Sequence, residues 1–261
     1  MIVKSWDDEL FIADRPWRRL ERHWHTVEPW QVHSRILATR APAGAPWAVL
    51  VHGLGVSGRY MTPLALALAH RFRVVVPDLP GHGRTKGPDN VLGVRDQAEV
   101  LGRWLAAAGI DGPHVIAHSL GCQVVVQLAG EPDADVRSLV LVGPAMDPAA
   151  RSAVWQATRL ARTMVHEPWP LVRLLAAEYL HRPAQAVTEL RTALDHDEET
   201  SARRVRAPSL VLRGARDRVA PPEWVGKLTR WLPDARAVDL PIGAHAVHAS
   251  HPCRVASLVD G

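Results

Sequence analysis

Short, almost wholly apolar segments alternate with stretches of helical periodicity from residue 47 onward. Such segments are typical of parallel strands, because helices cover both faces of a parallel sheet and leave neither face polar. The expected strands are Trp47–His52, Arg73–Pro77, His114–Ala117, Ser138–Val142 and Ser209–Arg213, with an alternating edge strand at Gln31–Thr39 and a late strand at Ala237–Leu240. The pattern predicts an α/β protein built on a mostly parallel sheet flanked by helices.

The connecting helices are expected at Thr62–Arg71, Gly93–Ala108, Leu120–Gly130, Pro222–Leu232 and Pro252–Val259. Residues 144–206 break the alternation, since they hold three helical patterns and no strand. The first of these patterns has Asp147 and Pro148 as N-cap and first-turn pair. Four residues then recur on one face, namely Val154, Ala157, Ala161 and Val165. We therefore predict a core of residues 31–143 and 207–261 with a helical cap inserted at 144–206.

The first 30 residues fit this alternation poorly. They combine four tryptophans with many charges, and a short helix is predicted over Pro16–His25. The segment 1–30 is treated as an N-terminal extension without an assigned function.

Composition limits the classes of function. No apolar run reaches the roughly 18 to 20 residues that span a bilayer, and Asp7, Asp8 and Glu9 lie where a signal peptide would be apolar. A cytoplasmic protein is expected. The net charge is +4, but the arginines are scattered and form no basic block, which argues against a nucleic-acid partner. Only three of the 31 basic residues are lysines (Lys4, Lys86 and Lys227), a bias typical of a GC-rich bacterial genome.

The string HVIAHSLGCQVVV at His114–Val126 runs from an apolar strand through a tight turn into a helix. Small residues stand two before and two after Ser119, at Ala117 and Gly121, because the flanking backbones approach closely in such a turn. The turn would lift the Ser119 hydroxyl above the sheet and place the N–H of Leu120 at a helix N-terminus, where anions are favoured.

With this turn the chain resembles the α/β-hydrolase superfamily, whose nucleophile elbow is G-x-S-x-G. Ala117 replaces the first glycine here and keeps the site small. The resemblance implies that Ser119 is a nucleophile. It extends to His52-Gly53, which precede an oxyanion-hole donor in the family, so Leu54 and Leu120 are expected to supply the two N–H donors. His52 itself is taken as a structural residue.

Asp78 to Thr85 resemble the family segment D-x-x-G-x-G-x-S/T, and Asp78 and His82 are taken as scaffold. The acid is expected at Asp217, which follows an expected strand and Gly214 as in the family's G-x-x-D loop. Asp147 is the competing acid, because some members carry the acid after the preceding strand.

Three histidines compete as the base, in the string PIGAHAVHASHP. His245 fits the family pattern of small-residue turn, histidine and later proline, with His248 as the fallback. A metal site of His245, His248 and His251 is the minor alternative, since no carboxylate or cysteine cluster completes it. No metal and no cofactor is expected.

The resemblance implies a serine hydrolase that acts on a small-molecule substrate, an ester or lactone with a largely apolar body, through an acyl-enzyme on Ser119. Carbon–carbon bond hydrolases and cofactor-free perhydrolases or haloperoxidases share this triad. Many of the former have Trp directly after the histidine, where this chain has Ala246. A ligand-binding homologue without catalysis is the remaining alternative. The sequence leaves the oligomeric state open.

The pocket is expected to be formed by His118 and by cap residues. The candidates from the cap are Trp155, Met164, Trp169 and Tyr179. The competing interpretation is that these side chains pack the cap helices onto the sheet.

Overall fold

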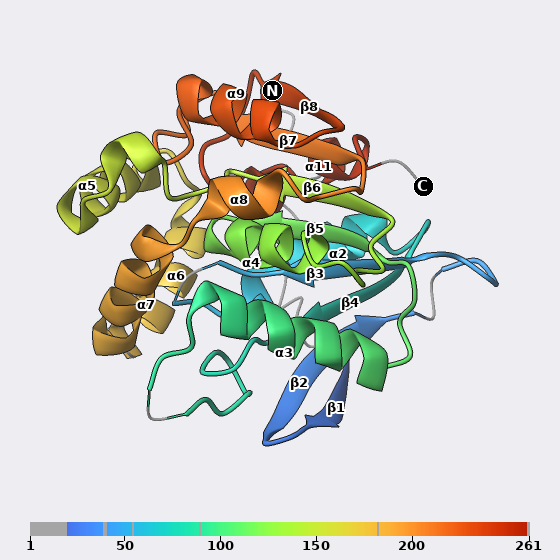
Figure 1. Ribbon diagram of the computed structural model, residues 1–261. Helices are drawn as coiled ribbons and strands as arrows, with labels where there is room; N and C mark the ends of the chain where they lie inside the picture. Colours follow the sequence, from blue (N-terminus) through green and yellow to red (C-terminus); the bar gives the residue numbers. More distant parts are fainter. Residues whose placement is uncertain (1–19, 39–40, 54, 89, 182, 260–261) are drawn as a thin grey trace.

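The computed structural model describes residues 20–38, 41–53, 55–88, 90–181 and 183–259. Eight strands form one sheet in the order β1-β2-β4-β3-β5-β6-β7-β8 (Figure 1). The strands are β1 (Glu21–Val27), β2 (Trp30–Leu37), β3 (Trp47–Val51), β4 (Arg73–Pro77), β5 (His114–His118), β6 (Ser138–Val142), β7 (Ser209–Gly214) and β8 (Ala235–Leu240). Only the pairings of β2 with β1 and with β4 are antiparallel. The predicted α/β fold with a mostly parallel sheet is confirmed.

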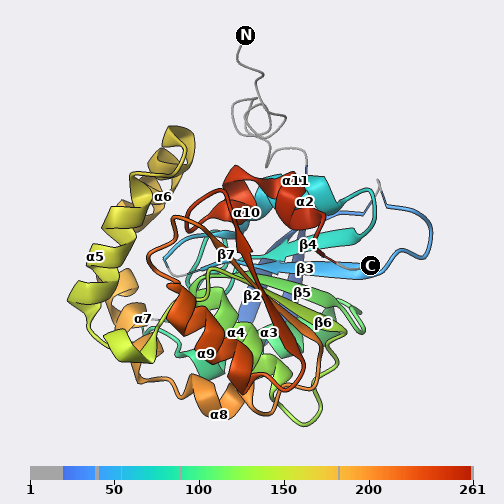
Figure 2. The same cartoon turned by 90° about the horizontal axis from the view of Figure 1, so that it is seen from above.

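Successive residues of each central strand face opposite layers of helices. In β3, Val49 and Val51 pack toward one apolar cluster while Ala48 and Leu50 pack toward the other, as the two-residue period of a strand requires. One face is covered by α3 (Val94–Ala107), α4 (Leu120–Ala129) and α9 (Pro222–Trp231). The other is covered by α2 (Thr62–Leu68), α10 (Val247–Ser250) and α11 (Pro252–Ala256). Figure 2 shows these two layers on opposite sides of the sheet.

The helices of the inserted segment gather at one end of the sheet (Figures 1 and 2). A 3₁₀ turn at Pro148–Ala150 leads into α5 (Ala153–Met164), α6 (Trp169–His181) and α7 (Pro183–Asp195). The fourth helix, α8 (Glu198–Ala202), packs instead in the layer of α4 and α9. Its Ser201 hydroxyl donates to Gln127 Oε1 of α4 at 2.7 Å.

The helix predicted over Pro16–His25 is wrong where the structure describes it. Residues 21–25 belong to β1, which pairs antiparallel with β2; residues 16–19 lie outside the described part. Nearly all side chains of β1 are exposed or half-buried, so its strand form depends on main-chain pairing with β2 and leaves little apolar pattern in the sequence.

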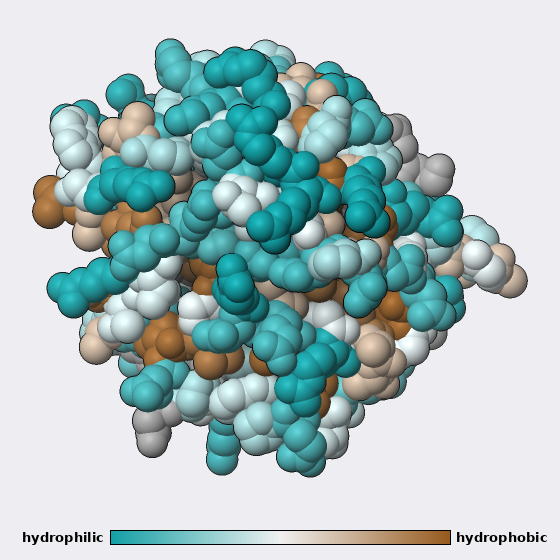
Figure 3. Space-filling view, in the orientation of Figure 1, coloured by the Kyte–Doolittle hydropathy of each residue, from teal (hydrophilic) through white to brown (hydrophobic). Residues whose placement is uncertain are grey.

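The buried face of α5 also differs from the prediction. Val154 and Val165 are each 76 % exposed, whereas Gln156 and Thr163 are buried. Because α5 covers a cavity and not the sheet itself, its inner face is partly polar and its outer face keeps apolar residues. Figure 3 shows a mostly polar surface interrupted by apolar patches on the side where α5 lies. Over the described ranges, no helix has both the length and the apolar character to cross a bilayer.

Candidate active site

Ser119 occupies a sharp turn between β5 and α4. Its backbone has φ 57° and ψ −123°, a conformation that a residue other than glycine adopts only under strain. Gly121 is required two residues later, because a Cβ there would lie 2.4 Å from the carbonyl oxygen of His52. The close approach of this backbone to the end of β3 explains the small residue that the sequence shows at this place.

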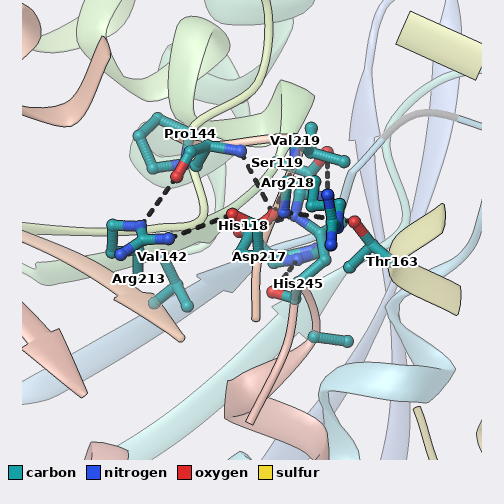
Figure 4. A network of polar contacts seen from close by, with 12 residues as sticks. His118, Ser119, Val142, Pro144, Thr163, Arg213, Asp217, Arg218, Val219 and His245 are labelled. Atoms are coloured by element: carbon teal, nitrogen blue, oxygen red, sulfur yellow. Dashed lines mark hydrogen bonds and ion pairs between the residues drawn. The ribbon is translucent and has the colours of Figure 1, made fainter. Parts of the chain in front are cut away.

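Three segments that are far apart in the sequence bring Ser119, His245 and Asp217 together (Figure 4). His245 Nε2 lies 3.0 Å from Ser119 Oγ, and His245 Nδ1 lies 3.0 Å from Asp217 Oδ2. Since a carboxylate only accepts, Nδ1 carries the proton and Nε2 is left to accept the hydrogen of the Ser119 hydroxyl. The structure therefore places these three predicted residues in the arrangement that activates a serine.

Asp217 and His245 each shift the pKa of the other toward its charged form. Burial alone would raise the pKa of Asp217, but the charge and hydrogen bond of His245 and the N–H groups of Ala220 and Val219 hold that pKa below its usual value. Burial would lower the pKa of His245, and Asp217 more than offsets this, so the pKa of His245 is raised. The pair favours an imidazolium ion beside Ser119.

The competing candidates lie in other surroundings. The Asp147 carboxylate accepts from the N–H of Ala149 at 3.0 Å and pairs with Arg159 at 3.0 Å, so it caps the 3₁₀ turn. His248 is fully buried, neither of its ring nitrogens has a partner among the described residues, and burial lowers its pKa to about 3. His251 Nδ1 lies 3.0 Å from Ser250 Oγ. Within the described ranges no three His, Cys, Asp or Glu side chains are grouped so that they could hold a metal ion.

His118 links the His245 loop to the loop after β3. Its Nε2 donates to the carbonyl oxygen of His245 at 3.0 Å, so its Nδ1 accepts from the Tyr60 hydroxyl at 2.7 Å. The N–H of Gly53 in turn donates to the Tyr60 oxygen at 2.8 Å. Burial holds the pKa of His118 well below its usual value, which keeps the ring neutral. Tyr60 was not predicted, because nothing in the sequence around it marks it as part of a site.

The expected oxyanion donors are the N–H groups of Leu120 and Leu54. Leu120 is the first residue of α4, and the first N–H groups of a helix have no partner within the helix. Leu54 lies outside the described residues, but its neighbour Gly53 packs against the nucleophile. A Cβ at Gly53 would lie 3.0 Å from Ser119 Cβ.

The predicted scaffold residues hold the loops after β3 and β4. The Asp78 carboxylate binds Arg35 at 2.7 Å, His33 at 2.8 Å and the N–H of Gly58 at 2.9 Å. Burial would raise the pKa of Asp78, but His33 and Arg35 hold it below its usual value. His52 accepts from the N–H of Leu79 at 3.0 Å. Burial lowers the pKa of His52 to about 4, which is consistent with a neutral structural ring.

A cavity of about 190 Å³ lies between Ser119 and the cap. His118, Met164 and Tyr179 line it as predicted, together with Leu160, Leu175 and Leu190 from α5, α6 and α7. Trp155 and Trp169 are not among the lining residues and are 56 % and 69 % exposed. The prediction of these two tryptophans as pocket residues is not met. The inner face of α5 carries Gln156 and Leu160 and leaves Trp155 on the outside, and Trp169, the first residue of α6, is exposed as well.

A larger cleft of about 780 Å³ is lined by Arg22, Arg59, Arg84 and other mostly polar residues. It shares Val56 with the first cavity but contains neither Ser119 nor His245. The smaller cavity, which contains Ser119 and His245, is therefore the better candidate for the substrate site.

Gly143 and Glu167 also belong to the site and were not predicted. Gly143 has φ 53°, and a Cβ there would lie 2.9 Å from Asp217 Oδ2 and 3.0 Å from His245 Nδ1. Glu167 lines the cavity, and its Oε1 accepts from the N–H of Ala246 at 2.7 Å. The end of β6 could have indicated the glycine, whereas no motif marks the glutamate.

The chain is similar in sequence to known proteins. The alpha/beta hydrolase family matches residues 48–258. RutD of Shigella flexneri, named as a provisional carbamate hydrolase, is 28 % identical over 242 residues, which cover 80 % of this chain and 88 % of RutD. The magnesium-chelatase 30 kDa subunit of Rhodobacter capsulatus is 37 % identical over 107 residues, but these cover only 41 % of this chain and 37 % of that subunit.

Solved structures show the same fold. The enol-lactonase from Burkholderia xenovorans superposes with a TM-score of 0.75 at 22 % identity, over 90 % of this chain and 97 % of the lactonase. A thermophilic esterase from Thermogutta terrifontis gives a TM-score of 0.75 at 21 % identity, over 91 % and 96 % of the two chains. From the family match over most of its length, this chain belongs to the alpha/beta hydrolase family.

Proposed function

We propose that this protein is a serine hydrolase that cleaves a carboxylic ester or lactone of a small, largely apolar substrate through an acyl-enzyme on Ser119. The observation that carries the proposal is the row of hydrogen bonds from Ser119 Oγ through His245 to Asp217 at the floor of an apolar cavity. A serine hydroxyl is a weak nucleophile until an adjacent base takes its proton.

The reaction follows from this arrangement. Ser119 Oγ attacks the substrate carbonyl carbon while His245 Nε2 takes the hydroxyl proton, and Asp217 stabilises the imidazolium ion. Backbone N–H groups, with Leu120 as one donor, stabilise the oxyanion. Collapse breaks the bond to the leaving alkoxide, which receives the proton from His245. Water then attacks the acyl carbon while His245 takes a proton from it. The bond between the acyl carbon and Ser119 Oγ breaks, His245 returns the proton to Oγ, and the acid departs.

The cavity supports a small and mostly apolar substrate. Its volume of about 190 Å³ lies below the roughly 300–1,000 Å³ of common ligand pockets. Its wall includes Ala145, Met146, Leu160, Leu175 and Leu190. A short acyl group fits such a space better than a long chain.

A carbamate is the second candidate substrate, supported by the similarity to RutD over 88 % of that protein. Attack of Ser119 on a carbamate carbonyl uses the same residues and releases an amine or an alcohol. The two candidates differ in the acyl group that the cavity admits and, where an amine is released, in the leaving group.

The experiment is a comparison of p-nitrophenyl esters of increasing acyl length with a p-nitrophenyl carbamate, using wild-type protein and the Ser119→Ala variant. Efficient turnover of acetate to hexanoate esters is expected, and Ser119→Ala should lower kcat by about 10⁶-fold. Unchanged turnover in Ser119→Ala would refute the assignment. Faster turnover of the carbamate than of every ester would favour the second candidate.

A further inference from the structure

One short cap segment, residues 163–167 at the end of α5, binds both loops that carry the partners of Ser119. The N–H of Arg218, directly after Asp217, donates to Thr163 Oγ1 at 3.2 Å (Figure 4). The N–H of Ala246, directly after His245, donates to Glu167 Oε1 at 2.7 Å. The same turn of chain therefore contacts the backbone immediately after each triad partner.

The segment is itself held in a fixed shape. The Thr163 hydroxyl donates to the Arg159 carbonyl at 2.8 Å, which leaves its oxygen to accept from Arg218. The N–H groups of His166 and Glu167 donate to the carbonyls of Thr163 and Met164 at 3.0 and 3.1 Å. Thr163 is fully buried and Glu167 is 8 % exposed. Two fixed acceptors of this kind hold the partner loops at defined positions.

Glu167 supplies more than a hydrogen-bond acceptor. One oxygen satisfies the N–H of Ala246, while Oε2 is buried and makes no hydrogen bond to any described residue. An amide or a backbone carbonyl would serve the N–H equally well, without the cost of a buried acid. Burial raises the pKa of Glu167, against the influence of the Ala246 N–H and of His245. Its charge in turn acts to raise the pKa of His245.

Two other acids of the cap helices, one in α6 and one in α7, hold different loops. Glu178 of α6 accepts from the N–H and hydroxyl of Ser57, and Glu189 of α7 accepts from the N–H of Gly55 and pairs with His82. These contacts fix the loops after β3 and β4, on the oxyanion side of the site. The contacts of residues 163–167 reach the acid and histidine loops instead.

We propose that Thr163 and Glu167 are positioning residues, and that the end of α5 aligns Asp217 and His245 through the N–H groups of Arg218 and Ala246. This inference rests on the proposed serine mechanism. Displacing a reacting group by about 1 Å can lower the rate by about 100-fold. Loss of either contact therefore reduces kcat more than it changes KM.

Paired substitutions test the two contacts. Glu167→Met and Thr163→Val remove the acceptors at similar volume, and each is expected to lower kcat about tenfold or more with KM changed less than threefold. Glu167→Gln and Thr163→Ser keep an acceptor oxygen and should restore most of kcat. The combined Glu167→Met, Thr163→Val variant should lose less than the product of the single losses, since both contacts serve one alignment.

A pH titration separates positioning from simple packing. The titratable groups that face His245 are Asp217, Glu167, His118 and His248. Glu167→Gln removes the negative charge but keeps an oxygen that accepts the hydrogen bond. The pKa of His245 should therefore fall, and the acid limb of the kcat/KM profile should move to lower pH. Glu198→Gln is the matched control, because Glu198 is also buried and has one unpartnered oxygen but lies in a different pocket beside Gln123. It should leave both kcat and the limb unchanged.

The same titration can be followed without turnover, by NMR of the His245 ring in protein labelled at histidine. A His245 pKa that is lower in Glu167→Gln and unchanged in Glu198→Gln supports the inference, even if no ester is hydrolysed and the proposed function fails. Turnover that depends on Ser119, with kcat, pH limb and ring pKa unchanged in the Glu167 and Thr163 variants, would overturn the inference and leave the proposed function intact.

Discussion

Among the single residues of the site, His245 is the one whose pKa several neighbours affect. Burial lowers its pKa, Asp217 raises it through charge and a hydrogen bond, and Glu167 raises it further through charge. The ring of His118 packs against the His245 ring, and the ring of His248 packs against His118; burial lowers the pKa of both, so both are neutral. A base whose pKa is held above its ordinary value accepts the Ser119 proton more readily.

The substitution Asp217→Asn tests this balance. It removes the main influence that raises the pKa of His245 and leaves the wrong tautomer at Nδ1, so kcat should fall by about 10⁴-fold. His245 must be neutral to act as base, hence activity rises with pH through its pKa. The acid limb of the residual activity should move to lower pH in a stopped-flow or steady-state pH profile. A limb that stays in place would mean that another group titrates.

The sequence predicted the three residues that the structure brings together at Ser119, but not the residues that hold them. Ser119, Asp217 and His245 each follow a strand and stand in a short local motif, so local spacing identifies them. Tyr60 and Glu167 enter the site only because the sheet order and the cap bring distant segments together. A short sequence motif cannot predict a contact between segments so far apart in the chain.

At the scale of elements, the cap is joined to the core by buried polar contacts as well as by apolar packing. Glu189 of α7 pairs with His82 at 3.0 Å, and its pKa is lowered by His82 despite burial. The length and helical pattern of residues 144–206 predicted a helical insertion. They did not predict the inner face of α5, because a helix above a cavity keeps no regular apolar stripe.

Glu189→Gln should loosen α7 selectively. A hydrogen bond to a charged group contributes about 1.5–3 kcal/mol, so amide hydrogen exchange in α7 should become about 10- to 100-fold faster while exchange in α4 is unchanged. The control is Glu199→Gln, whose pair with Arg203 is largely exposed and contributes little. Equal acceleration in α4 and α7 would show that the pair stabilises the whole molecule and not the cap alone.

At the scale of the whole molecule, the apolar core of the sheet was the part most fully predicted, since strands covered on both faces must be apolar throughout. The exposed edge strand β1 was missed for the opposite reason.

A buried acid outside the site adds a pH dependence that sequence could not show. Glu198 is 3 % exposed, and burial raises its pKa to about 8 although Gln123 donates a hydrogen bond to it.

Glu198 should make the folded protein less stable as the pH rises. The native state keeps a proton that the unfolded chain releases near the ordinary glutamate pKa of 4.5, so stability falls between that pH and about pH 8 by an amount on the order of 4 kcal/mol. Glu198→Gln should remove this fall. Urea unfolding at pH 5 and pH 8 measures it, and an equal loss in both proteins would exclude Glu198 as its source.

Covalent labelling tests most directly whether Ser119 is an activated nucleophile. Folded wild-type protein is treated with a fluorophosphonate probe, and the adduct is located by mass spectrometry of the intact chain and of its peptides. One adduct per chain, on Ser119, is expected, with none in Ser119→Ala and far slower labelling in Asp217→Asn. The assignment of Ser119 would be contradicted if folded wild-type protein remained unlabelled, or if the Ser119→Ala variant were labelled equally well.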